Sequence, residues 1–455
     1  MNVRDFSNLS ILELSPVKAK PSDRASVEIY RPFFLAGIFS VLTVGCLLGA
    51  IALFGIGQTG TYTSATWAPF ILAHANSQLF GWVGFFIMGF ALQQHAPTLA
   101  KVKLYHQLAW FSLIAMGLGI ALRFVAEPMV ATNRTTWLPV GVAACTLQLA
   151  AVAAFVFNTS FTRHRKGGEL GWQTRFVFAS LFWLIVVAAA EPFVFAYSHQ
   201  TNKLDSIQFI ARWYPVLREA QFLGFVAMMI FGVSLVKLNS CFGFRESYAS
   251  LGKAAYSIWT VGLILRMFGW LFAFDQGFVA GSQILFFAGG ACIAAAGMAL
   301  VVTSRVFEAT KGSQRSHKFV RGAYSWLIVA ALMILWDPIQ LRLLGAPFSH
   351  AYTGASRHAV TVGFISQMIL GFGCHVTARM NDFVESKMAP LWSAFFLLNI
   401  GNAARVGLEI ASDFTPAAFA PMGITGFVEL VGLGIWAYYV AGPMLVPKLR
   451  LRYVE

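Results

Sequence analysis

Residues 67–93 read WAPFILAHANSQLFGWVGFFIMGFALQ and contain no Lys, Arg, Asp or Glu. A helix needs about 20 mostly apolar residues to cross a bilayer, so this stretch is long enough to span one. Its apolar residues follow one another without alternation, which favours a helix over a strand of a membrane barrel. The stretch therefore predicts a transmembrane helix that carries an ionisable residue, His74.

The composition of the whole chain has the same character. Of the 455 residues, 58% are hydrophobic and only 11% are charged, and the mean hydropathy is +0.67. Soluble domains carry about 25% charged residues, so this chain cannot cover a globular surface of its size with charge. The apolar content also excludes a disordered chain. We therefore expect a membrane protein whose 43 Phe and 13 Trp contact lipid and its interfaces.

Twelve segments are long and apolar enough to cross a membrane, which predicts an all-α membrane protein with about 12 transmembrane helices. The connections between them are too short for a soluble domain. We expect one transmembrane domain over residues 32–445 between tails at 1–31 and 446–455. The predicted spans are 32–55, 67–93, 106–130, 136–158, 174–197, 215–236, 253–275, 281–304, 319–341, 356–377, 388–410 and 421–445.

Lys and Arg residues are unequally divided between the two sides of these spans. The tails and the loops after even-numbered spans hold 24 of the 33, whereas the opposite side holds six. Cytoplasmic loops carry such an excess, so we expect a protein of the bacterial inner membrane with both termini in the cytoplasm. The net charge of +14 therefore marks orientation, and we expect lipid and not nucleic acid as the partner. The first 30 residues lack the apolar core of a signal peptide.

A pattern of four residues recurs along the chain. A Gly is followed by Ile after six residues, by a second Gly after two more, and by an Arg 34 residues later. An Arg inside an apolar span is rare and costly, so three of them at matching places indicate a repeat. We predict three four-helix repeats, about 32–158, 174–304 and 319–445, around a pseudo-threefold axis. The pattern occurs as Gly81-Ile87-Gly89-Arg123, Gly224-Ile230-Gly232-Arg266 and Gly363-Ile369-Gly371-Arg405, with offsets of 143 and 139 residues.

Two histidines, His74 and His358, lie inside the outer third of the second and tenth spans. Counted from the aligned glycines, Asn76, Glu219 and His358 occupy equivalent positions. Because an ionisable residue inside a membrane marks a functional site, we predict that His74 and His358 ligate a metal or a heme. Glu219 could hold a metal or relay protons, and His350 is a further candidate metal ligand on the same side. The alternative is a pair of neutral histidines that are hydrogen bonded within the bundle.

Arg123, Arg266 and Arg405 end the third, seventh and eleventh spans near the outer face. A buried Arg needs an anionic partner, and one interpretation is that acidic residues within the bundle are these partners. The other is that the guanidinium groups bind carboxylates of a cofactor, such as heme propionates, and both can hold at once. The candidate acidic partners are Glu127, Glu219, Asp275 and Glu409.

Three acidic residues directly precede a proline. The residue before a proline disfavours helical torsion angles, so these pairs predict helix ends with acidic caps that face the outside. The pairs are Glu127-Pro128, Glu191-Pro192 and Asp337-Pro338.

The segment RHAVTVG at 357–363, the MILG run and Arg379 that follow it, and His74 before FGWVG resemble the NnrS family of membrane proteins. The resemblance covers most of the chain in helix count and is specific around the second and tenth spans. Members of that family contain heme and copper and are linked to nitric-oxide stress and denitrification. The resemblance therefore implies a b-type heme, a copper ion and a small gaseous ligand.

Twelve helices in three repeats also resemble the catalytic subunit of heme-copper oxidases and nitric-oxide reductases. That superfamily holds a low-spin heme by histidines on helices 2 and 10, which His74 and His358 match. The other metal-binding histidines of that superfamily have no counterpart in this chain, because the sixth span offers Glu219 and the seventh has no His. The resemblance implies heme binding, without a standard copper centre or proton pumping.

These observations predict a heme-binding membrane protein of the NnrS type in nitric-oxide metabolism or resistance to nitrosative stress. One alternative is a divergent oxidase-like subunit, a heme-dependent oxidoreductase with a redox partner or a small gaseous substrate. A second alternative is a transporter of small anions, which the parallel repeats disfavour because transporter repeats are often inverted. A Soret band of the purified protein would favour heme over transport.

The charge distribution predicts that residue 15 faces the cytoplasm. A Ser15→Cys variant should react with a membrane-impermeant maleimide in inside-out vesicles and not in intact spheroplasts, relative to the unsubstituted chain. Asn133→Cys, in the loop after the third span, should react in the opposite preparation. Labelling of residue 15 in spheroplasts would contradict the topology.

Overall fold

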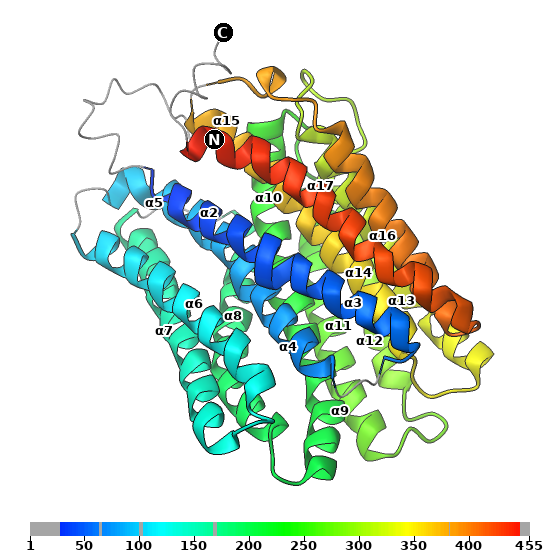
Figure 1. The fold of residues 1–455 in the computed structure, drawn as a ribbon. Helices are drawn as coiled ribbons and strands as arrows, with labels where there is room; N and C mark the ends of the chain where they lie inside the picture. Colours follow the sequence, from blue (N-terminus) through cyan, green and yellow to red (C-terminus); the bar gives the residue numbers. More distant parts are fainter. Residues whose placement is uncertain (1–27, 63–65, 100–102, 167–170, 382, 446–455) are drawn as a thin grey trace.

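The computed structural model describes residues 28–62, 66–99, 103–166, 171–381 and 383–445. Within these ranges the chain forms helices and loops without a strand. Twelve helical spans are long and apolar enough to cross a membrane, which confirms the predicted fold class. The first and last spans lie side by side, and their terminal ends share one end of the bundle (Figure 1).

Eight of the spans in the described part of the chain are formed by one continuous α-helix. Two short 3₁₀ segments, η6 (Glu385–Lys387) and η7 (Pro416–Ala418), flank the eleventh and twelfth spans. The continuous helices are α6 (Lys103–Met129), α7 (Arg134–Lys166), α8 (Thr174–Ser198), α11 (Ala249–Asp275), α12 (Ile284–Ser304), α13 (His317–Leu344), α16 (Trp392–Ser412) and α17 (Phe419–Leu445).

The other four spans each contain a π-helical segment. The first consists of α2 (Tyr30–Ser40), η2 (Val41–Gly45) and α3 (Cys46–Thr59), and the second of α4 (Ala68–Asn76), η3 (Ser77–Gly84) and α5 (Phe85–Leu99). The sixth consists of α9 (Lys203–Glu219), η4 (Ala220–Ala227) and α10 (Met228–Phe242). The tenth consists of α14 (His350–His358), η5 (Ala359–Ser366) and α15 (Gln367–Met380).

Three of the π segments, η3, η4 and η5, are each eight residues long. Their first residues are separated by 143 and then 139 positions, which are the offsets of the sequence pattern. π segments inside α-helices are rare and often occur at functional sites. The residues that precede them are Asn76, Glu219 and His358, the three that the sequence aligns. This agreement supports the predicted threefold repeat.

Helix contacts follow the same offsets. The second glycine of the pattern packs against a phenylalanine on the preceding span, so that a Cβ there would lie 2.7, 3.1 or 3.5 Å from the phenylalanine Cβ. Small residues let helix backbones approach closely in a membrane. The pairs are Gly89–Phe33, Gly232–Phe176 and Gly371–Phe319.

The structure corrects two expectations about helix ends. The pairs Glu191-Pro192 and Asp337-Pro338 do not end their helices, because α8 continues to Ser198 and α13 to Leu344. A proline inside a membrane helix is tolerated where neighbouring groups satisfy the freed backbone. The sixth span begins at Lys203 instead of 215, because its polar first turns continue the helix through Pro215. α9 is therefore an outward extension that a search for apolar runs does not find.

The packing of α11 against α12 predicts the effect of a single methyl group. A Cβ at Gly289 would lie 2.4 Å from the backbone nitrogen of Arg266. Gly289→Ala should therefore destabilise the protein by about 1–3 kcal/mol through overpacking, seen as a lower melting temperature in detergent. Gly407→Ala is the control, since nothing lies within 4 Å of its Cβ position. Equal melting temperatures for the two variants would contradict this packing.

Candidate functional site

His74 is oriented by the first span. Its Nδ1 lies 2.8 Å from the carbonyl oxygen of Gly45, the last residue of η2. The ring lies against Gly49, where a Cβ would be only 2.5 Å from its Cε1. Because a carbonyl oxygen only accepts, Nδ1 carries the proton and Nε2 keeps its lone pair. Nε2 has no hydrogen-bond partner among the described residues.

His358 has the same arrangement on the tenth span. Its Nδ1 lies 3.0 Å from the carbonyl oxygen of Gly354 and 3.7 Å from Glu409 Oε2. These acceptors again place the proton on Nδ1 and leave Nε2 without a partner in the described part of the chain. Although the residue lies deep in the bundle, 30% of its side chain is accessible. The described residues therefore cover His358 only in part.

The two histidines share their charged neighbours. Both are close enough to Arg405 to interact with it electrostatically, and His358 also interacts with His74. Arg405 lies 3.0 Å from Glu409, and Glu429 on α17 is close to both. We call these five residues the histidine cluster: His74, His358, Arg405, Glu409 and Glu429.

Unsatisfied polar atoms gather at the histidine cluster. Arg405 Nη1 and Glu429 Oε1 are buried and have no hydrogen-bond partner among the described residues. Both polar side-chain atoms of Asn402, one turn before Arg405 on the same face of α16, are also unpartnered, and this residue is 1% exposed. Buried polar groups in proteins are almost always hydrogen bonded, and exceptions mark a bound water, an ion or a functional group. The cluster is therefore suited to hold a polar or anionic group beside the two imidazoles.

Tyr62 lies at the outer side of this cluster, in the loop after the first span. Its hydroxyl is 2.8 Å from the hydroxyl of Ser412. Burial, together with the charge of Glu409, raises the pKa of Tyr62 to about 12. The phenol is therefore protonated at neutral pH and available as a hydrogen-bond donor.

The three repeated arginines pair with acidic residues, as one of the two interpretations predicts. Arg123 donates to Glu127 at 2.6 Å and lies 3.2 Å from Glu191. Asp275 does not pair with Arg266, the arginine of the same predicted repeat, because it pairs with Arg212. The remaining pairs are Arg266–Glu219 and Arg405–Glu409, both at 3.0 Å.

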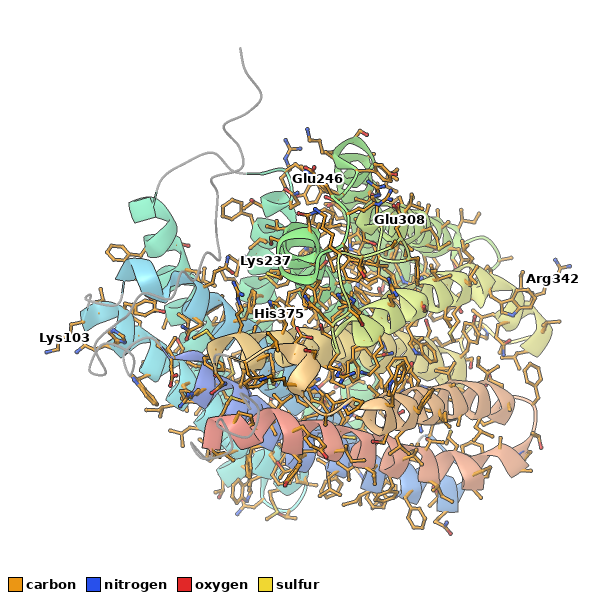
Figure 2. The ribbon with its side chains drawn as sticks, turned by 90° about the horizontal axis from the view of Figure 1, so that it is seen from above. Lys103, Lys237, Glu246, Glu308, Arg342 and His375 are labelled. Carbon is orange, nitrogen blue, oxygen red and sulfur yellow. The ribbon has the colours of Figure 1, made fainter. Side chains whose placement is uncertain are left out.

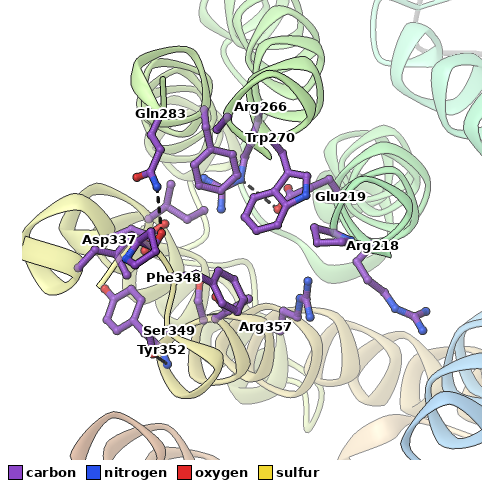
Figure 3. Close-up of a pocket in the computed structure, with 18 of the residues that line it drawn as sticks. Arg218, Glu219, Arg266, Trp270, Gln283, Asp337, Phe348, Ser349, Tyr352 and Arg357 are labelled. Carbon is purple, nitrogen blue, oxygen red and sulfur yellow. Dashed lines mark hydrogen bonds and ion pairs between the residues drawn. The ribbon is translucent and has the colours of Figure 1, made fainter. Parts of the chain in front are cut away.

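Glu219 and His350 lie outside the histidine cluster. Glu219 faces α11 and α13, where it lines a separate cavity with Arg266, Asp337 and Arg357 (Figure 3). His350 is the first residue of α14, is exposed, and contacts Phe348 in an edge-to-face arrangement. Eight residues of helix, about 12 Å, separate it from His358. The structure therefore brings together His74, His358 and Arg405, but not the other predicted ligands.

A third group of polar residues fills the space between α6, α8 and α9. Glu191 accepts hydrogen bonds from both Arg123 and Gln221, and Gln221 also binds Arg218. On the second span, Asn76, which aligns with Glu219, forms two hydrogen bonds with Gln148. Sequence reasoning missed this network because it assigned Glu191 to a helix cap. Its side chain is in fact buried.

His375 lies at the end of the bundle that carries the termini; seen from that end, His375 and Lys237 lie toward the middle of the bundle, whereas Lys103 and Arg342 lie at the edges of the view (Figure 2). His375 Nδ1 is 2.8 Å from Glu385 Oε1. The other carboxylate oxygen accepts hydrogen bonds from the backbone and hydroxyl of Ser316. Burial alone would raise the pKa of Glu385, but His375 and Ser316 hold this pKa below its usual value. This cluster joins α15 to the start of α13.

Comparison with known proteins adds no assignment to these sites. No protein-family model matches the chain, and no curated protein matches it. The resemblance to NnrS proteins therefore stays a prediction, and the residues of the histidine cluster are the basis for any proposal.

The cluster around Glu385 predicts a pH-dependent stability. Glu385→Gln should cost about 1.5–3 kcal/mol at pH 7, because it weakens charged hydrogen bonds from His375 and Ser316. A carboxylate whose folded pKa is depressed stabilises the protein above its ordinary pKa of 4.5, and this contribution is lost as the pH falls through the lower folded value. The melting temperatures of variant and parent should therefore converge below pH 4.5. The exposed Glu246→Gln serves as control, and a pH-independent difference would contradict the assignment.

Proposed function

We propose that the protein binds heme through His74 and His358 and acts in nitric-oxide metabolism or in resistance to nitrosative stress. The observation that carries the proposal is the matched state of the two imidazoles. In each, a backbone carbonyl binds Nδ1 and leaves Nε2 free. Metal-binding histidines commonly have this arrangement, because the outer hydrogen bond selects the tautomer and orients the ring.

The surroundings of the histidines fit such a group. About 30% of the His358 side chain is accessible, and its neighbours include several polar atoms that have no hydrogen-bond partner among the described residues. Arg405 Nη1 and the amide of Asn402 are donors of the kind that bind carboxylates, as heme propionates would require. Glu409 and Glu429 lie nearby, so the site offers both donors and acceptors.

When bound, the heme would supply redox chemistry, which two histidine ligands tune. The protein residues have separate tasks. His74 and His358 would supply the ligating nitrogens, and the carbonyls of Gly45 and Gly354 keep their rings in place. Glu409 accepts from Arg405 at 3.0 Å and so holds the guanidinium at the cluster. A copper ion is a further expectation of the resemblance to NnrS proteins.

The absorption spectrum of the purified full-length protein tests the proposal, with iron and copper analysis of the same sample. The parent should show a Soret band and one equivalent of heme after expression with a heme precursor. His74→Ala and His358→Ala should each lose the spectrum of the parent, because each removes one of the two nitrogens that would hold the iron.

Two further variants sharpen this test. His106→Ala, on α6 outside the cluster, controls for the loss of any histidine, and it should keep the parent spectrum. His350→Ala should also keep it, since His350 is exposed at the start of α14. A colourless parent protein, or an unchanged spectrum in both His74→Ala and His358→Ala, would overturn the proposal.

A further inference from the structure

A second site lies on the other side of the tenth span. At the end of the bundle opposite the termini, α9, α11, α13 and α14 enclose a cavity of about 70 Å³ (Figure 3). We call it the arginine pocket and define it by the five charged residues that line it, three arginines and two carboxylates: Arg218, Glu219, Arg266, Asp337 and Arg357. Its walls also include Trp270, Phe348 and Phe222.

The charges of the arginine pocket are not balanced within the protein. Arg266 is compensated, because its Nε lies 3.0 Å from Glu219 and its guanidinium lies 4.1 Å from the centre of the Phe286 ring. Its Nη1 is buried and has no hydrogen-bond partner. Arg357 forms neither a side-chain hydrogen bond nor an ion pair with any described residue, and its charged neighbours are two arginines, Arg218 and Arg266, and, beyond ion-pairing distance, the carboxylates of Glu219 and Glu409.

A guanidinium that no carboxylate pairs with, beside two other arginines, favours an anion, because a charge without a direct partner in a protein interior is costly. Figure 3 shows the Arg357 side chain among the residues that line the cavity, across from Asp337. A guanidinium presents its donors in a planar fork that matches two oxygens of one planar anion. Arg357 and the free Nη1 of Arg266 thus supply donors on two walls of one cavity.

The remaining features limit the size and charge of this anion. A water molecule needs about 10–15 Å³ of such space, so 70 Å³ holds roughly five waters and excludes nucleotides and sugar phosphates. Glu219 and Asp337 also line the cavity, and their carboxylates would repel a second negative charge on the ligand. The aromatic walls accept a short apolar group.

From these contacts we propose that the arginine pocket binds a small, planar, monovalent oxyanion, such as a short carboxylate, with Arg357 as its principal ligand. The site is separate from the histidine cluster, although Arg357 and His358 are adjacent in the chain. It opens at the end of the bundle opposite the termini, where Pro347 and Ser349 form part of its lining.

Binding of radiolabelled acetate to the detergent-solubilised full-length protein, measured by equilibrium dialysis, tests this proposal. Arg357→Gln should weaken binding at least tenfold, and Arg357→Lys should recover only part of it, because an ammonium lacks the planar fork. Arg342→Gln is the matched control. It removes the same charge from an exposed position of α13 and should change binding less than twofold.

Competition and thermal stability decide the ligand class and exclude misfolding. Nitrate, which is planar and monovalent, should displace acetate, whereas sulfate should not. Acetate should raise the melting temperature of the parent and of Arg342→Gln but not of Arg357→Gln. Equal acetate binding by the parent and a folded Arg357→Gln protein would overturn the proposal, and so would displacement by sulfate as effective as that by nitrate.

Discussion

Charge inside this bundle must be neutralised inside the bundle, since no water reaches most of the buried positions. Arg123 illustrates the rule, because its side chain is only 3% exposed and contacts both Glu127 and Glu191. An ion pair of this kind is costly to desolvate, and removing one partner is costlier still. The packing of the outer half of the protein therefore depends on which oppositely charged residue each buried charged side chain contacts. The two candidate sites lie at Arg405, whose Nη1 has no hydrogen-bond partner, and at Arg357, which forms no ion pair with any described residue.

The number of helices and their order could be predicted from the sequence, because the apolar runs are long and most Lys and Arg residues lie in the loops and tails between them. The outer extension of the sixth span could not, since α9 carries Lys203, Asp205 and Arg218 and so lacks an apolar run. The prolines also led to wrong predictions of helix ends, because the effect of Pro192 on α8 depends on the residues packed around it and not on the residue before it.

The candidate sites were predictable in part. His74 and His358 stand out in the sequence as ionisable residues within apolar spans, and the structure places both beside Arg405. Asn402 could not be singled out, because an amide in a membrane helix is usually hydrogen bonded and its lack of partners is a property of the packed helices. Arg357 is likewise an ordinary arginine in sequence, and only the residues around it show that no carboxylate pairs with it.

The π segment η5 begins directly after Arg357 and His358. A π turn holds more residues than an α turn, so it changes the rotation between the helix before it and the helix after it. On the inner side, Gly371 packs against Phe319 and fixes the rotation of α15. The part of the tenth span before η5 can therefore direct Arg357 toward the arginine pocket and His358 toward the histidine cluster without disturbing that packing. One helix thus works as two segments with independent registers, and the chemistry of its outer half can diverge in evolution while its inner half stays unchanged.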